Sequence, residues 1–219
     1  MTRKSLLFIT IIWALLASCK RENIKQGTVI YNIDYQLPDS LARYKNYLPK
    51  SAIAYFKGDS TVSIQQAGAD VTTVITNKPT GFMRVLLRSP TAKYVIDYNK
   101  SEQSEILPSG AGYTYAVTKE TKMIAGHKAL KYVLTDKATG LSSEGWFSKE
   151  ISAVPNYLTT VFDTTYGVPL AFTTIQNGMP VKTTVRGINF APIPAGVFAT
   201  PEGYQKMTPE QFKNLPVDN

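Results

Sequence analysis

Hydrophobic and polar residues alternate along most of the chain, in short segments that are separated by turn residues. In Thr28–Tyr35, for example, Val29, Tyr31, Ile33 and Tyr35 share one face of a predicted strand. Further short strands are predicted at Ala52–Lys57, Thr61–Gln66, Val71–Thr76, Phe82–Arg88, Lys93–Asn99, Glu102–Leu107, Tyr113–Thr118, Lys119–Ile124, Lys128–Thr135, Leu141–Ser148, Leu170–Gln176 and Val181–Phe190. Strands this short, with turns this closely spaced, favour an antiparallel meander or barrel over a parallel sheet.

Two segments have helical spacing instead. After the start signal Pro38-Asp39-Ser40, the residues Leu41, Tyr44, Tyr47 and Leu48 recur at the period of a helix that Pro49 ends. Near the C-terminus, Thr208-Pro209-Glu210-Gln211 is a capping-box pattern that predicts a short helix over Pro209–Leu215. The predicted fold class is therefore mainly β (α+β), with a few short helices.

The first nineteen positions have a different pattern. Arg3 and Lys4 precede the apolar run Ser5–Leu16, which has the length of a signal-peptide core and is too short to span a bilayer. The run ends in Leu16-Ala17-Ser18-Cys19, which resembles the bacterial lipobox, in which the cysteine is acylated and the chain is cut just before it. The alternatives are an ordinary secretory signal with a chance cysteine, or an N-terminal membrane anchor.

These segments predict the domain organisation. Residues 1–18 form the signal peptide, residues 19–27 a lipidated tether, and residues 28–219 one β-rich domain. The mature chain of 201 residues is long enough for one sizeable core, and it has no second long apolar run, so no transmembrane helix is expected. An anchor with two or more acyl chains holds a protein stably on a membrane, which makes the membrane the first expected partner, through Cys19.

Composition excludes several functions. The formal net charge is +8, but the basic residues are scattered singly and form no basic helix, so no nucleic-acid partner is expected. Cys19 is the only cysteine, which excludes a disulfide within the chain and thiol catalysis once that cysteine is acylated. With one histidine, His127, and no zinc or nucleotide motif, we expect no metal and no cofactor.

Catalytic motifs are also missing. The chain has no G-x-S-x-G or S-x-x-K motif, and His127 stands beside a predicted hairpin turn. Glu102 and Glu105 are three apart, which puts them on opposite sides of the strand predicted there and argues against an acid–base pair. We therefore expect no enzymatic activity, with a hydrolase that uses His127 as the weakest alternative.

Aromatic residues at alternate strand positions are either core residues or the walls of an apolar cavity. Together with the predicted helix, they form the candidate set of ligand-binding residues: Leu41, Tyr44, Tyr47, Leu48, Phe82, Tyr94, Tyr98, Tyr113, Tyr115, Trp146 and Phe172.

Four stretches resemble a family of Bacteroidetes lipoproteins. They are the hairpin KMIAGHKALKY at 122–132, the strand end WFSKE at 146–150, the strand start GVPL at 167–170, and the closing segment from Val197-Phe198 to Gly203-Tyr204. The resemblance covers about Thr28–Met207, and it departs from the family at Ala129, where relatives often carry cysteine. The family is similar to the LolA/LolB-like lipoprotein carriers. That similarity implies a strongly curved antiparallel sheet, or incomplete β-barrel, with short helices on its concave side and an apolar cavity between them.

Three functions remain open. The first is a non-enzymatic lipoprotein of the cell envelope that holds an acyl chain or another hydrophobic ligand under the helix with Leu41 and Tyr44. The second is a protein–protein interaction module of the envelope with a filled core and no ligand, and the third is the hydrolase. Lys20 follows the cysteine, and Lys20-Arg21-Glu22-Asn23 is net basic, which indicates the outer membrane, facing the periplasm.

Overall fold

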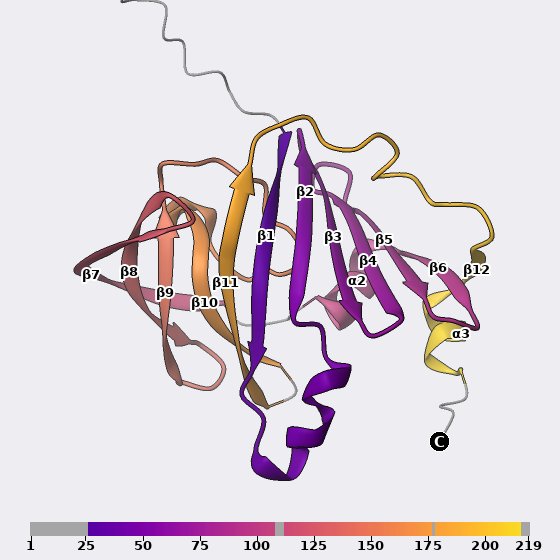
Figure 1. Ribbon diagram of the computed structural model, residues 1–219, viewed down its shortest axis with the longest axis horizontal. Helices are drawn as coiled ribbons and strands as arrows, with labels where there is room; N and C mark the ends of the chain where they lie inside the picture. The colour runs from indigo at the N-terminus through magenta and orange to yellow at the C-terminus, as the bar shows by residue number, and fades with distance from the viewer. Residues whose placement is uncertain (1–25, 108–111, 177, 216–219) are drawn as a thin grey trace, which may run out of the picture.

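The computed structural model describes residues 26–107, 112–176 and 178–215 (Figure 1). The strands are β1 (Gln26–Tyr35), β2 (Ser51–Lys57), β3 (Ser60–Ala67), β4 (Asp70–Asn77), β5 (Phe82–Arg88), β6 (Lys93–Tyr98), β7 (Tyr113–Ile124), β8 (His127–Asp136), β9 (Ser142–Ser148), β10 (Val168–Gln176), β11 (Met179–Asn189) and β12 (Gln205–Met207). The helical elements are η1 (Asp39–Tyr47), α2 (Lys100–Ile106), η2 (Thr164–Tyr166) and α3 (Pro209–Lys213). None of these described helices is long and apolar enough to cross a membrane.

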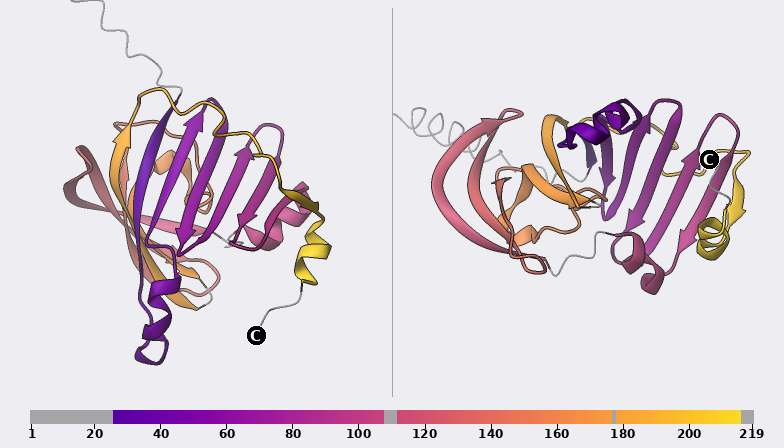
Figure 2. Two further views of the ribbon diagram at one scale, coloured as in Figure 1. Left: turned by 45° about the vertical axis from the view of Figure 1, so that its right-hand side comes forward. Right: turned by 90° about the horizontal axis from the view of Figure 1, so that it is seen from below.

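All twelve strands belong to one open sheet, in the order β12-β6-β5-β4-β3-β2-β1-β11-β10-β9-β8-β7. The pairs are antiparallel except for the short β12, which runs parallel to β6. β1 lies in the middle of the sheet, because it pairs with β2 on one side and with β11 on the other. The sheet curves most at its β7–β9 end (Figure 2).

The register places one row of small and apolar side chains on the same face of five neighbouring strands. This inner face carries Val29, Ala54, Ser63, Val74 and Val85, each opposite the next. The irregular segment of residues 149–167, here called the inner loop, packs on it through Leu158 and Phe162, and Leu107 and Phe212 pack on it farther along.

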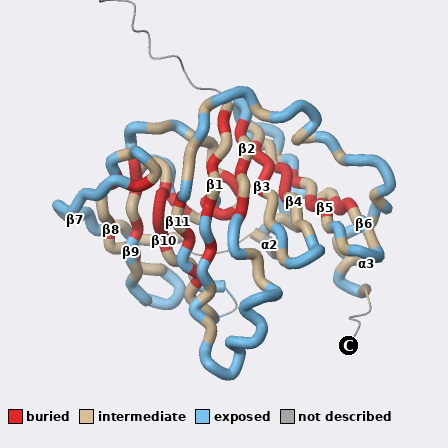
Figure 3. The backbone as a smooth tube through the Cα atoms, in the orientation of Figure 1, coloured by how far each residue is buried: buried red, intermediate tan, exposed pale blue. Residues whose placement is uncertain are grey.

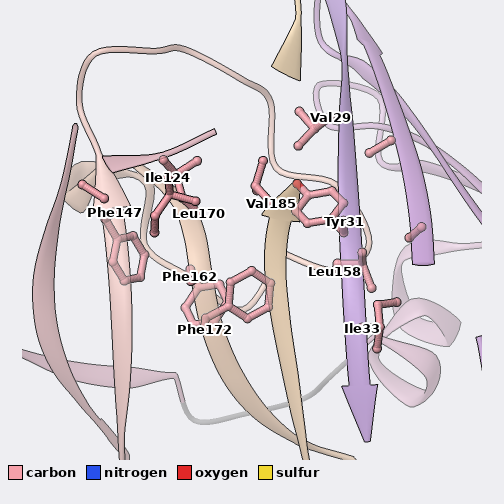
Figure 4. Close-up of a cluster of buried hydrophobic side chains, with 14 of the residues drawn as sticks. Val29, Tyr31, Ile33, Ile124, Phe147, Leu158, Phe162, Leu170, Phe172 and Val185 are labelled. Carbon is pink, nitrogen blue, oxygen red and sulfur yellow. The ribbon is translucent and has the colours of Figure 1, made fainter. Parts of the chain in front are cut away.

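The inner loop packs on the hydrophobic cluster that surrounds the central strand. Phe147, Phe162 and Phe172 are buried there together with Tyr31 of the central strand (Figures 3 and 4). The rings of Phe162 and Phe172 meet edge to face at 4.7 Å between centroids, a favoured geometry for aromatic pairs. The inner loop, a later part of the same chain, therefore fills this part of the inner face of the sheet.

A second segment, residues 190–204, covers the opposite, outer face of β2–β6 and is here called the strap. Its Phe198 and Tyr204 pack on a cluster that includes Val62 and Leu86. Arg84 fastens it, since Nη1 donates to Thr200 Oγ1 at 2.9 Å while Nε and Nη2 bind the Asp97 carboxylate. Both faces of this half of the sheet are therefore covered by later parts of the chain.

The mostly β fold with a large curved, open sheet and few short helices agrees with the prediction. The predicted hairpin at Ala125-Gly126 is confirmed, with φ values of 49° and 81° at these two residues. The predicted strand at Glu102–Leu107 is wrong, because this segment lies in and just after the helix α2. Asn99 accepts backbone hydrogen bonds from Ser101 and Glu102, and Glu102 accepts one from Asn99, so a capping box starts a helix here.

The predicted helix at Ser40–Leu48 is the 3₁₀ helix η1, and it does not cover the inner face. It projects from the lower end of β1 in Figure 1, and none of its residues is buried. The capping box at Thr208 and Gln211 is confirmed, and it starts α3 at Pro209.

Candidate functional site: a cleft between the inner loop and the sheet

A cleft of about 620 Å³ opens between the inner loop and the inner face of the sheet. Its closed end is formed by the buried side chains of Tyr31, Phe56 and Phe162, which come from β1, β2 and the inner loop. Exposed polar residues, among them Asp59 and Ser152, line it toward solvent. The cleft thus has aromatic side chains together with the buried polar residues Asn156 and Thr159 in its interior, and exposed polar residues at its entrance.

The inner loop also supplies the walls between these ends. The segment from Ile151 to Pro155 runs along the cleft, and Val168 and Pro169 at the start of β10 complete the wall. The side chains of this segment are mostly half-buried, so the cleft is bounded by packed chain on the side of the loop. Long irregular segments inside a compact domain are often functional, which makes this loop the first candidate.

Asn156 holds the loop in place. Its Oδ1 accepts a hydrogen bond from Leu158 N at 3.0 Å, and its Nδ2 donates to the hydroxyl of Tyr31 at 2.9 Å. Its own backbone N–H donates to Thr159 Oγ1 at 2.9 Å. Asn156 and Tyr31 are both buried, so this bond joins the loop to the central strand through two well-packed side chains.

Burial raises the pKa of Tyr31 to about 12, although the hydrogen bond from Asn156 acts in the opposite direction. The phenol is therefore neutral at physiological pH. It marks the closed end of the cleft as a place that disfavours negative charge.

A second attachment fixes the far end of the inner loop. The backbone N–H of Asp163 donates to Tyr115 Oη at 2.9 Å, and the ring of Tyr115 stacks on Tyr166 with 3.9 Å between centroids. Gly167 then turns the chain into β10 with φ of 109°, a conformation that residues with a Cβ rarely adopt. The loop is thus held at its middle and at its end.

The predicted ligand residues of η1 lie away from the cleft. Leu41, Tyr44 and Tyr47 are 38%, 44% and 76% exposed, and Leu48 is half-buried. The nearest tie of this helix to the sheet is an exposed ion pair between Lys45 Nζ and Asp34 Oδ1 at 2.8 Å. The expectation that this helix covers a ligand therefore does not match its position.

The predicted aromatic residues of the strands are distributed over several clusters. Tyr94 and Tyr98 belong to the cluster around Ile96, and Phe82 is exposed with the Arg84 guanidinium 5.4 Å from its ring centroid. The ring of Trp146 faces Lys122 Nζ at 3.9 Å.

The others contribute to the core under the inner loop. Tyr113 stacks on Phe162 at 5.4 Å, Tyr115 stacks on Tyr166, and Phe172 packs against Phe162. None of the eleven predicted ligand residues lines the cleft. Cys19 lies outside the described residues, so its lipidation stays a prediction.

Sequence reasoning missed the inner loop because it lacks a period. Consecutive residues of this loop line the cleft, because the segment is neither helix nor strand. A search for alternating or helical hydrophobic patterns therefore does not detect it. Tyr31 and Phe56 were predicted on strands, and their place at the cleft depends on the distant loop. The available signal was the length of the irregular stretch with Pro155 inside it.

His127 lies beside the start of the inner loop. Its Nδ1 is 3.9 Å from Glu150 Oε2, and its ring meets Phe190 edge to face at 6.4 Å. Among the described residues no serine or threonine hydroxyl is hydrogen-bonded to His127, so these contacts provide no nucleophile–base pair. Among all residues that the structure describes, no group of histidine, cysteine, aspartate or glutamate side chains could hold a metal ion.

No protein-family model matches the chain, and no curated protein matches it in sequence. Among solved structures, one described as "Structure of PNGF-II in C2 space group" is similar, with a TM-score of 0.49 and 13% identity. The match covers 86% of this chain and 32% of that one, so the chain spans about a third of the length of that protein. At this identity and TM-score the likeness indicates nothing about function. The fold and the cleft define this chain only as an open-sheet, mostly β protein with a partly enclosed cleft.

Proposed function

We propose that this protein is a non-enzymatic lipoprotein of the bacterial cell envelope that binds an acyl chain or another hydrophobic ligand in the cleft under the inner loop. The observation that carries the proposal is the cleft of about 620 Å³, closed by buried Tyr31, Phe56 and Phe162. Its volume lies within the range of about 300–1,000 Å³ that is usual for small-molecule sites.

The chemistry of the walls favours an apolar ligand with a polar end. Each methylene group that leaves water for such a wall contributes about 0.8 kcal/mol. The neutral phenol of Tyr31 at the closed end disfavours a charged group there, whereas the exposed side chains at the entrance suit a solvated headgroup. We therefore place the chain of the ligand inside and its headgroup at the entrance.

The anchor belongs to the same proposal. Acylated Cys19 would fix the protein to the outer membrane, facing the periplasm, since Lys20 and its basic neighbours lack the acidic pattern of surface-exposed lipoproteins. The curved open sheet, with the inner loop and α2 against one face, supports a distant relation to the LolA/LolB-like carriers. In this relation the inner loop takes the place that the resemblance implied for the predicted helix Ser40–Leu48.

Ligand binding is tested with residues 20–219, which include every described residue and lack the acylated cysteine. Native mass spectrometry detects co-purified lipid, and the fluorescence of cis-parinaric acid reports binding in solution. Ala153→Trp fills the cleft and should weaken binding about tenfold or more, whereas Ala138→Trp on the exposed β8–β9 turn should not. Far-UV circular dichroism shows that both variants remain folded.

Two results contradict the proposal. Protein that neither carries lipid nor binds the fluorescent fatty acid rules out the ligand. Equal binding by the two tryptophan variants places the ligand elsewhere.

A specific observation favours the second candidate, an interaction module of the envelope. Leu41, Tyr44 and Tyr47 are exposed on η1, which follows the C-terminal end of β1 (Figure 1). Aromatic residues are enriched at protein interfaces, so this helix would contact an envelope protein. In the test, all three residues are replaced by serine. If the variant loses a crosslinked partner but still binds the ligand, the two functions belong to different surfaces.

A further inference from the structure

The cleft entrance and the start of β1 lie at the same end of the sheet. Gln26, the first residue of β1, is opposite Lys57, the last residue of β2 (Figure 1). The next two residues of the chain, Gly58 and Asp59, line the cleft. Neighbouring strands are about 5 Å apart, so β1 begins beside the cleft entrance.

Other residues that line the cleft come from this end too. Strands β1, β11 and β10 are antiparallel in turn, so β1 and β10 begin at the same end of the sheet. Val168, the first residue of β10, lines the cleft and is opposite Ser148, where β9 ends. The other end of β1, which leads to η1, is about 33 Å away along this strand of 10 residues.

The length of the tether limits how far the cleft entrance can be from a membrane. Residues 19–25 span at most about 25 Å when they are fully extended. With Cys19 acylated as proposed, the start of β1 and the adjoining entrance therefore stay near the lipid headgroups. The end of the domain that carries η1 is not limited so closely.

Exposed lysines at this end of the sheet form a surface that is here called the basic rim. They are Lys57, Lys78, Lys128 and Lys149. None of their ammonium groups forms an ion pair or hydrogen bond with a described residue. Asp59 and Glu150 are the acidic residues near them in sequence, so the rim has a net positive charge that complements anionic headgroups.

We propose that the cleft takes up an acyl chain directly from the bilayer to which Cys19 attaches the protein, with the basic rim against anionic headgroups. This inference rests on the ligand binding and the anchor proposed above, and it adds the source of the ligand. Uptake at the bilayer surface keeps the chain out of water, where its apolar surface is costly to expose.

The test changes the residue through which the domain is attached to vesicles. Cys19 is the only cysteine, so the unacylated chain 19–219 couples to a maleimide phospholipid at that residue alone. A second form carries Cys19→Ser with Tyr47→Cys and is coupled at position 47 of η1, where Tyr47 is 76% exposed. The vesicles contain phosphatidylcholine, about one fifth phosphatidylglycerol, and a phosphatidylcholine with a photoreactive diazirine in one acyl chain.

Mass spectrometry measures the label on the segment Ile151–Pro155 after a fixed illumination. We expect at least about tenfold more label when the domain is attached at position 19, because the entrance is then held at the bilayer. Ala153→Trp, which fills the cleft, should remove this label.

Binding of cis-parinaric acid by both forms in solution separates the two proposals. If neither form binds it, the ligand site itself is wrong. If both forms bind it but the label is equal at the two attachment points, or absent from both, the cleft does not take its ligand from the bilayer and this inference is overturned.

Charge variants of the form coupled at Cys19 test the basic rim. Lys57→Glu with Lys128→Glu and Lys149→Glu should lower the label about tenfold. The matched control makes the same change at three exposed basic residues of the other end of the sheet: Arg43, Lys50 and Lys137. It should leave the label unchanged, and equal labelling of the two triple variants overturns the proposed contact of the rim with the bilayer.

Discussion

One hydrogen bond, from Asn156 Nδ2 to the hydroxyl of Tyr31, connects the inner loop with the central strand across 125 positions of the chain. Both partners are buried, so the loss of one leaves the other without this hydrogen bond in a position with little exposed surface. The pair positions the closed end of the cleft. At the scale of single residues, it is the contact on which the proposed ligand site most depends.

A double-mutant cycle measures this contact. Asn156→Ala should lower the free energy of unfolding by about 2–3 kcal/mol, because the loop turn and the Tyr31 hydroxyl both lose a partner. Tyr31→Phe should cost about 1 kcal/mol, and the double variant should cost about 1 kcal/mol less than the sum. Urea unfolding gives these values. Strictly additive effects would show that the bond contributes nothing, and Asn46→Ala, at an exposed asparagine, is the control.

The same tyrosine predicts behaviour at high pH. Below pH 10 the phenol is protonated in both states; above pH 10 the unfolded chain ionises, whereas the folded protein holds the proton until its raised pKa of about 12. The free energy of unfolding should therefore fall between these values. Burial raises the pKa of Tyr35, Tyr113 and Tyr157 too, so Tyr31→Phe should reduce the fall by about 2–3 kcal/mol and not abolish it.

At the scale of elements, the path of the inner loop depends on Gly167, the residue at which it ends. Gly167 has φ of 109°, and a Cβ there would collide with the carbonyl oxygen of Ser148 on the adjacent strand β9. The loop can therefore return to the sheet only through glycine. The helix α2 depends in a similar way on its capping box, since Asn99 and Glu102 satisfy its first backbone N–H groups.

Gly167→Ala tests the loop end. It should lower the free energy of unfolding by about 3 kcal/mol, because the new methyl group adds a backbone clash to the strain of the positive φ. Thermal and urea unfolding report the change.

Gly58→Ala is the matched control. Gly58 also has a positive φ, of 56°, but a Cβ there would meet nothing within 4 Å, so only the strain of about 1 kcal/mol remains. Equal losses in the two variants would mean that the contact with Ser148 does not matter.

At the scale of the whole molecule, the β2–β6 half of one open sheet has both of its faces covered by later segments of the chain. The inner loop packs on one face, and the strap packs on the other through Phe198, Tyr204 and the hydrogen bond that Thr200 accepts from Arg84. Arg84 also forms an ion pair with Asp97 of the neighbouring strand. The guanidinium of Arg84 holds the pKa of Asp97 below its usual range, so this contact weakens when the carboxyl is protonated in acid. In the proposal, the domain is attached to the membrane only through the segment before β1.

The anchor gives the prediction at this scale. When the full chain is produced in a bacterium fed radioactive palmitate, it should carry the label and sediment with membranes, whereas Cys19→Ser should lose both properties. Ser18→Ala keeps a small residue before the cysteine and should behave like the unchanged chain. Labelling that persists without Cys19 would exclude the lipobox interpretation.

The sequence by itself determined the strands and most turns of this protein. The alternation of buried and exposed residues in β1 and the positive φ of Gly126 in its turn are local features. They depend on the direction of successive side chains and on turn stereochemistry, which involve only residues close in sequence. Even the helix α2, which was predicted as a strand, had its cause in the local pair Asn99 and Glu102.

Only the tertiary structure decided which residues meet. Tyr31 was predicted on the apolar face of its strand, but its place in a cleft depends on Asn156, far away in the chain. Tyr44 and Tyr47 had the right period for a core helix and are exposed, because no residue of η1 is buried against the described part of the chain. Packing between distant segments follows from the path of the whole chain, and the irregular inner loop has no period from which that path could be predicted.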